Sequence, residues 1–154
     1  MSQYEAGIHF MAPLVLDYEA NKRIAGRIGN KCDAAAPHNA FRCLGPDRWC
    51  AISVFTDQEW HSFCSVIEGA GLADDPRFGT LLARKKNEEE LDRLVNEWTS
   101  TRTAEEVMKL MQDAGVPAGV VETGEDLLDH DPHLKQRGTF VELEYPGIGK
   151  YRSQ

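Results

Sequence analysis

Apolar side chains recur every three or four residues in three segments of the chain, and a helix-capping pattern precedes each segment. Thr56 and Thr103 are each followed three residues later by a glutamate, the spacing of a capping box, and Asn87 precedes three glutamates. We expect Gly69 and Gly115 to end the first and third helices. The predicted buried stripes are Trp60, Phe63, Cys64 and Ile67; Leu91, Leu94, Val95 and Trp98; and Val107, Leu110, Met111 and Ala114.

A hairpin is predicted before the first of these helices. Residues 41–44 and 48–55 flank the turn sequence Gly45-Pro46-Asp47 and read as strand, turn and strand. Both faces of residues 48–55 are largely apolar, which predicts a central strand covered on both sides.

Shorter elements are predicted toward the end of the chain. We expect a strand, a short helix, a helical turn begun by Asp131-Pro132 and a last strand at residues 118–121, 125–128, 131–138 and 139–145. Residues 150–154 carry no pattern that predicts structure. The fold class is therefore α+β, a small antiparallel sheet of about three strands covered by several helices.

The first part of the chain predicts a helical lead-in. Aromatic and aliphatic residues recur at four-residue spacing within residues 3–24, and Pro13 bends or interrupts that helix. Glycine, asparagine and proline make residues 25–39 an irregular connection. We divide the chain into a lead-in, a small domain and a final segment at residues 1–39, 40–145 and 146–154.

Charge and cysteine usage narrow the range of partners. The 154 residues include 17 basic and 25 acidic side chains, a formal net charge of −8. An acidic surface argues against nucleic acid or an anionic membrane as the partner, and no apolar run reaches the roughly 18 residues of a membrane span. The four cysteines lack the spacing of a zinc site, so we expect reduced thiols, a cytoplasmic protein and no metal.

The residues by themselves present no self-contained catalytic constellation. Serine-hydrolase, P-loop and dinucleotide motifs are absent from the sequence. Cys64 lies on an apolar stripe and is interpreted as a core thiol, and Arg84-Lys85-Lys86 is interpreted as a solvated patch before a helix. A short glycine-containing loop at residues 26–31 could approach a phosphate through Arg27 and Lys31.

An ordered series of short motifs between residues 27 and 145 gives the chain a family resemblance. The series consists of Asp47-Arg48-Trp49-Cys50-Ala51-Ile52, Thr56-Asp57-Gln58-Glu59-Trp60, Asp75-Pro76-Arg77-Phe78, Arg84-Lys85-Lys86-Asn87, Trp98-Thr99, Asp113-Ala114-Gly115-Val116-Pro117-Ala118-Gly119, Asp131-Pro132-His133-Leu134 and Arg137-Gly138. In this order the motifs resemble those of the class III CoA-transferases, the CaiB/BaiF family.

The resemblance implies a larger enzyme of which this chain is a fragment, the small domain. Family members also have a large nucleotide-fold domain, on which residues 1–39 are expected to pack and to which residues 146–154 are expected to return. The implied activity moves CoA from an acyl-CoA thioester to a free carboxylic acid through an aspartyl intermediate. The nucleophilic aspartate is implied to lie in the large domain, so we assign no catalytic residue here and expect the fragment alone to be inactive.

The resemblance also implies the ligands and the assembly. CoA and acyl-CoA are expected as substrates and not as tightly bound cofactors, and the whole protein is expected to form an intertwined homodimer. The fragment alone is expected to be a monomer.

One loop of the small domain approaches the active site in some family members. Arg27-Ile28-Gly29-Asn30 is similar to the stretch that precedes a glycine-rich loop in formyl-CoA transferases, but alanines follow it here. Alanine restricts the backbone more than glycine does, which argues against formyl-CoA as the substrate. The candidates for the edge of the acyl-CoA pocket are Arg27, Lys31, Ala34, Ala35 and Ala36.

Two alternatives stay open. The related 2-methylacyl-CoA racemases carry a functional glutamate just after the second hairpin strand, a place that falls near Thr56, with Glu59 three residues further on. Thr56 reads as a helix cap, which disfavours this alternative. The second alternative is a non-catalytic binding or interaction module that has kept the fold.

The lead-in is expected to be less ordered than residues 41–145. Backbone amides of residues 5–25 should exchange with solvent faster than those of residues 104–114, because segments with few buried contacts open at low free-energy cost. Amide hydrogen exchange followed by NMR measures this difference, and equal protection in the two segments would contradict it.

Overall fold

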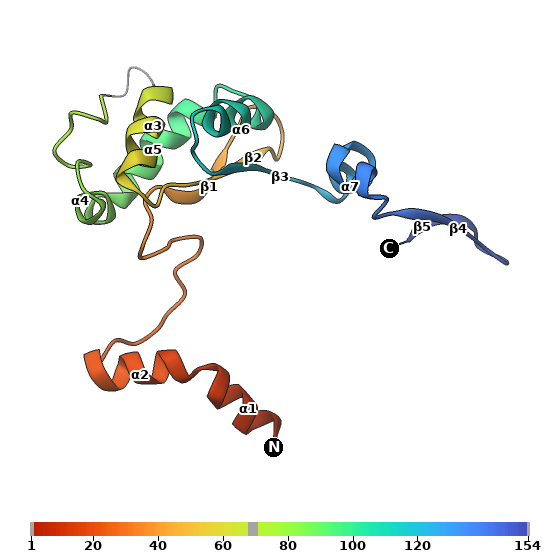
Figure 1. Cartoon of the computed structure of the whole chain (residues 1–154), viewed down its shortest axis with the longest axis horizontal. Coiled ribbons are helices and arrows are strands. Elements are labelled where there is room, and N and C mark those ends of the chain that lie inside the picture. The colour runs from red at the N-terminus through yellow and green to blue at the C-terminus, as the bar shows by residue number, and fades with distance from the viewer. Residues whose placement is uncertain (1, 68–70, 154) are drawn as a thin grey trace.

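The computed structural model describes residues 2–67 and 71–153 of the chain. Within these residues a central body carries the hydrophobic core, while the N-terminal helices and the C-terminal hairpin extend from it in different directions (Figure 1). The fold is α+β, as the sequence predicts. The predicted helix end at Gly69 lies outside the described residues.

A three-stranded antiparallel sheet forms the floor of the central body. Its order is β1-β2-β3, so β2 is the central strand, as predicted. Ala51 of β2 lies opposite Ala40 on one side and Gly119 on the other. The strands are β1 (His38–Arg42), β2 (Trp49–Ser53) and β3 (Ala118–Val121).

Only one face of β2 is covered. Cys50 and Ile52 are completely buried, whereas Ala51 is exposed. Trp49, on the same face as Ala51, donates its indole N–H to Asp47 at 3.0 Å and lies beneath the guanidinium of Arg42. The prediction that both faces are covered is therefore wrong. Trp49 can stay partly exposed to solvent because its indole N–H has a hydrogen-bond partner, so no second layer of helices is required on this face.

Four helices surround the covered face. The helix α5 packs along β1, and α6 packs along β2 and β3 (Figure 1). The helices are α3 (Asp57–Val66), α4 (Leu81–Lys86), α5 (Glu88–Thr99) and α6 (Ala104–Asp113). Fully buried core side chains between helices and sheet include Phe41, Ile52, Phe63, Phe78, Leu91, Val95, Val107 and Met111.

Both predicted capping boxes are confirmed. The Thr56 hydroxyl accepts a hydrogen bond from the Glu59 backbone N–H at 3.1 Å, and the Glu59 carboxylate accepts one from the Thr56 N–H at 3.0 Å. Thr103 and Glu106 repeat this exchange at the start of α6. Asn87 precedes α5 as predicted but does not cap it through its side chain, which instead donates to the carbonyl oxygen of Ala83.

The helix α4 was not predicted, and it corrects the interpretation of residues 84–86. Thr80 caps this helix by accepting a hydrogen bond from the Ala83 N–H at 3.2 Å. Arg84 has no exposed surface, so it is not part of a solvated patch. Its position continues the buried face of α5, with buried residues spaced four or three apart through both helices: Arg84, Glu88, Leu91, Val95 and Thr99.

The first strand begins earlier than predicted. Residues 38 and 39, expected in the irregular connection, pair with β2 from His38 opposite Ser53 onward, and β1 ends at Arg42 instead of residue 44. The Asn39 side chain accepts a hydrogen bond from the Ala40 N–H, so this residue keeps its usual local bonding while its backbone is extended.

The N-terminal part forms two helices. The predicted interruption is present: α1 (Gln3–Phe10) and α2 (Ala12–Asn21) meet at Met11, and Pro13 occupies the first turn of α2. Neither helix buries a residue, and α2 ends where Lys22 adopts the left-handed conformation. Among the described residues, no helix combines the length and the apolar character needed to cross a membrane.

Two short helical elements follow β3. A π-helical turn, η1 (Asp126–His130), stands where a short helix was predicted, and α7 (Pro132–Arg137) follows it. Asp131 caps α7 by accepting from the Leu134 N–H at 2.7 Å, and Gly138 closes it at a positive φ of 61°. Both features agree with the sequence prediction.

The chain ends in a hairpin that the sequence only half predicts. The strand β4 (Val141–Tyr145) lies within the predicted 139–145, but β5 (Gly149–Ser153) occupies residues for which no structure was predicted. Leu143 pairs with Tyr151 across this hairpin. The hairpin joins residues on both sides of position 145, and the division of the chain at that position stays a prediction.

Burial differs between two leucines on neighbouring helices, α4 and α5. Leu91 is fully buried and Leu82 is 82% exposed. Replacing Leu91 with alanine should lower the free energy of unfolding by about 3 kcal/mol, because the core loses apolar contacts and gains a cavity. The matched replacement Leu82→Ala should change it by less than about 0.5 kcal/mol. Urea denaturation measures both, and similar losses in the two variants would contradict this placement of the core.

Candidate functional site

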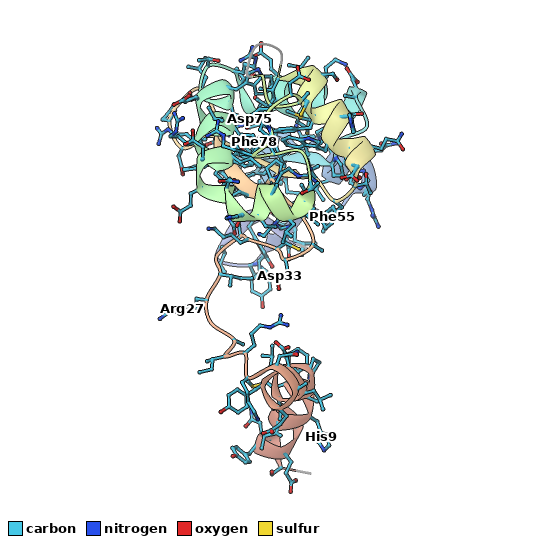
Figure 2. The ribbon with its side chains drawn as sticks, turned by 90° about the vertical axis from the view of Figure 1, so that its left-hand side faces the viewer. His9, Arg27, Asp33, Phe55, Asp75 and Phe78 are labelled. Carbon is cyan, nitrogen blue, oxygen red and sulfur yellow. The ribbon has the colours of Figure 1, made fainter. Side chains whose placement is uncertain are left out.

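The candidate loop, residues 27–37, has an exposed part at residues 27–34 and a buried root at residues 35–37. Arg27, Lys31 and Ala34 are exposed, whereas Ala35 and Ala36 have no exposed surface. Figure 2 shows Arg27 on the connection between the N-terminal helices and the central body. The loop therefore offers side chains to a ligand only over its first eight residues, up to Ala34.

Backbone hydrogen bonds attach the root of the loop to the sheet. The Ala36 N–H donates to the Val54 carbonyl oxygen at 3.1 Å, and the Val54 N–H donates to the Pro37 carbonyl oxygen at 2.9 Å. These bonds extend the pairing of β1 and β2 by two residues. The peptide bond between Ala36 and Pro37 is cis. The two backbone hydrogen bonds fix the path of the loop where it enters the sheet.

A chain of polar side chains links the exposed part of the loop to α5. The Asn30 amide donates to the Asn39 side-chain oxygen at 3.1 Å, and the Asn39 amide donates to an Asp92 carboxylate oxygen at 2.9 Å. The His38 Nδ1–H donates to the Asn30 carbonyl oxygen at 2.5 Å, because a carbonyl can only accept. Asn30 is therefore held both through its side chain and through its backbone.

Lys31 is held by a buried carboxylate. Its ammonium group lies 3.7 Å from one oxygen of Glu88, while Lys85 lies 2.6 Å from the other. The Glu88 side chain is only 8% exposed. Burial of a carboxylate is tolerated when opposite charges contact it, and here two lysines do so. Of the two basic candidates, Lys31 is ion-paired, whereas Arg27 has no recorded partner among the described residues.

A shallow cavity of about 630 Å³ lies between the loop and α5. Its lining combines basic and acidic side chains with two neutral ones: Lys31, Arg42, Arg93, Glu89, Asp92, Glu97, Asn96 and Ser100. Burial raises the pKa of the Asp92 carboxyl group, although the hydrogen bond from Asn39 opposes this shift. One carboxylate oxygen of Asp92 is buried without a hydrogen-bond partner in the described structure.

The guanidinium of Arg84 lies directly beneath the root of the loop. Its Nε–H donates to the Ala36 carbonyl oxygen at 2.9 Å, and Nη1–H donates to the Phe78 carbonyl oxygen at 3.3 Å. The group lies 4.5 Å from the centre of the Trp60 ring, within reach of a cation–π interaction. Burial lowers the pKa of Arg84, and Asp57 at 3.7 Å partly offsets this.

A second cavity of about 400 Å³ lies beside α6 and η1. Arg48 bridges Glu105 and Asp126 there, with both N–O distances at 2.7 Å. The backbone N–H of Thr123 and the Arg48 guanidinium lower the pKa of Asp126 to about 2. This carboxylate is strongly stabilised in its charged form, which makes it a poor nucleophile.

The residue near which a racemase glutamate would fall acts as a helix cap. Both the Phe55 and the Thr56 backbone N–H groups donate to Glu59 Oε2, at 2.7 and 3.0 Å. Cys64 lies partly buried against the core, as predicted, and burial raises the pKa of its thiol to about 11.

Sequence reasoning found Lys31 but missed Asp92 and Arg84. Asp92 follows Leu91 on a helix with a clear apolar stripe, and no motif distinguishes it from a solvated residue. Arg84 could have been recognised from its spacing, because it stands four residues before Glu88 and seven before Leu91. The structure brings Lys31 to the cavity that Asp92 lines, and Arg27 does not line it.

Comparison with known proteins decides the family. The model of CoA-transferase family III matches residues 1–154. The chain belongs to this family. It is 41% identical over 113 residues, 73% of its length, to a Mycobacterium tuberculosis protein named "Probable CoA-transferase Rv1866". It is 30% identical over 151 residues, 98% of its length, to the succinyl-CoA–D-citramalate CoA-transferase of Chloroflexus aurantiacus.

The fold of this family III chain matches that of solved structures of other proteins. A CaiB/BaiF family protein from Brucella suis superimposes with a TM-score of 0.74 at 23% identity, over 92% of this chain and 39% of that one. A second neighbour, Rv3272 from Mycobacterium tuberculosis, gives a TM-score of 0.72 at 21% identity, over 99% of this chain and 38% of that one. The chain spans 14% of the first curated relative and 37% of the second.

The raised pKa of Asp92 predicts a pH-dependent effect of Asp92→Asn. A carboxyl group whose pKa is higher in the folded state favours folding when protonated, so its ionisation reduces stability as the pH rises above about 3.9. The variant should therefore be more stable than the parent at pH 7 and should lose this advantage at pH 3. Urea midpoints at the two pH values measure the effect. Asp113→Asn, at an exposed position, is the control, and an advantage of Asp92→Asn that is equal at both pH values would contradict the prediction.

Proposed function

We propose that this chain is the small domain of an enzyme that transfers CoA from an acyl-CoA thioester to a free carboxylic acid. The observation that carries the proposal is the 30% identity over 151 residues to a succinyl-CoA–D-citramalate CoA-transferase. Further relatives are a succinyl-CoA:mesaconate CoA-transferase and formyl-CoA:oxalate CoA-transferases. The acceptors in these names are dicarboxylic acids, and we extend this acceptor class to the whole protein.

The loop before β1 is proposed to form one edge of the acyl-CoA pocket. Arg27 is an exposed cation that can meet a phosphate or a carboxylate, and Lys31 stands at the same loop with its charge shared with Glu88. Alanines 34–36 make the loop stiffer than a glycine-rich one, which supports a donor other than formyl-CoA. Ala35 and Ala36 contribute by fixing the backbone, since their side chains are buried.

The aspartyl nucleophile is proposed to lie outside these 154 residues. A nucleophilic carboxylate needs open space beside it and hydrogen-bond donors for the developing oxyanion. Asp126 is held by Arg48 and Thr123, and Asp92 is half-buried against Asn39, so neither meets both needs. The whole enzyme is proposed to be an intertwined homodimer in the cytoplasm, where the four free thiols of this chain would stay reduced.

The 154-residue chain alone should show no CoA transfer from succinyl-CoA to D-citramalate, mesaconate or oxalate, while the whole protein that contains it should transfer CoA to at least one of them. Liquid chromatography of the CoA esters measures both. Turnover by the chain alone would overturn the location of the nucleophile. Epimerisation of a 2-methylacyl-CoA by the whole protein, without any acceptor acid, would replace the transferase by a racemase. Absence of both activities in the whole protein would favour a non-catalytic binding module.

A further inference from the structure

Arg84 is a fully buried charged side chain that the proposed chemistry does not use. None of its surface is exposed, and it is the largest of the completely buried side chains in the described part of the chain. Moving a guanidinium out of water is unfavourable, and an apolar side chain of similar volume would fill the same space without that penalty. Packing alone therefore does not explain why a charged side chain with five N–H donors occupies this buried position.

The partners of Arg84 supply that explanation. Its two hydrogen-bonded acceptors, the carbonyl oxygens of Ala36 and Phe78, belong to segments outside the named helices and strands. The Phe78 segment lacks the regular bonding of a helix or a strand, and the Ala36 segment has such bonding only through its two backbone hydrogen bonds with Val54. The flat guanidinium rests on the Trp60 ring, which orients the donors toward both carbonyls. One side chain of α4 thus holds two irregular segments against α3.

The same helical face holds the loop a second time. Glu88, one helical turn after Arg84, lies between Lys31 and Lys85. Arg84 binds the buried root of the loop through Ala36, and Glu88 binds its exposed part through Lys31. The two contacts lie five residues apart on the loop and four residues apart on the helical face, so they fix both its position and its direction.

We propose that Arg84 is the positioning residue of the loop at residues 27–37, setting where Arg27 and Lys31 stand relative to the acyl-CoA. This inference rests on the proposed function, since it gives the loop a ligand. Arg84 does not touch the ligand. Its loss displaces the loop and weakens acyl-CoA binding, while the chemical step, carried by an aspartate elsewhere, keeps its rate once the substrate is bound.

Hydrogen exchange on the labelled 154-residue chain tests the structural half. The variants are Arg84→Met, which removes every donor, and Arg84→Lys, which keeps the charge and folds if the methionine variant does not. The control is Arg102→Met, because Arg102 also stacks on a tryptophan, Trp98 at 4.1 Å, but donates only to neighbours within four residues. The reporters are the amides of Ala36 and Val54, against those of Val107 and Met111 in α6 for global opening.

The expected result is a local loss of protection. In either Arg84 variant, the Ala36 and Val54 amides should exchange about ten-fold or more faster relative to the α6 amides, because the root loses the guanidinium N–H that donates to the Ala36 carbonyl oxygen. The control should leave that ratio unchanged. Equal acceleration of all four amides in the Arg84 variants would overturn the proposal, since it would make Arg84 a general core residue. So would an unchanged ratio.

Kinetics of the whole protein test the functional half. With Arg84→Lys, the KM for succinyl-CoA should rise about ten-fold while kcat stays within about three-fold, because only substrate binding depends on the loop. Arg102→Met should change neither constant. Equal falls in kcat and kcat/KM, with KM unchanged, would overturn the positioning role. A whole protein without CoA transfer but with the expected exchange pattern would refute the proposed function and leave Arg84 as the anchor of the loop.

Discussion

The burial of one guanidinium is the constraint on which the central body depends. A charge without access to water must find its hydrogen bonds inside the protein, and Arg84 makes two of them with the main chain, at Ala36 and Phe78, while its Nη2 is buried without a hydrogen-bond partner in the described structure. The two hydrogen bonds from Arg84 restrict where these carbonyl groups can lie. The Trp60 ring of α3 also contacts this guanidinium. The hydrophobic core brings helices and sheet together, but this polar contact determines where the irregular segments run between them.

Sequence patterns predicted best those features that depend only on residues close together in the chain. The capping boxes at Thr56 and Thr103 and the Asp131 cap depend on residues three apart, and all are present. Elements that depend on distant partners were less accessible. The strand β5 exists through its pairing with β4, and β1 extends back to His38 because β2 lies opposite. No local pattern in residues 150–154 records that pairing.

The candidate site was predicted in part for the same reason. Arg27 and Lys31 stand in a loop that glycine and asparagine mark in the sequence, whereas Asp92 gains its raised pKa from burial by residues far along the chain. Arg84 was misread because three basic residues in a row are usually solvated. Only the helical continuity of α4 with α5 turns one of the three inward. The family resemblance rests on the order of motifs between residues 27 and 145, so errors in single residues do not remove it.

The stretch between the N-terminal helices and the body also acts as a tether of defined reach. It leaves α2 at Asn21 and is held again at Asn30, and a fully extended backbone between these points spans at most roughly 32 Å. The end of α2 must therefore lie within that radius of Asn30, and any surface that the exposed side chains of α1 and α2 cover must pass close to that end. Within it, the two helices meet such a surface at a high effective concentration, so even weak contacts suffice to keep them there.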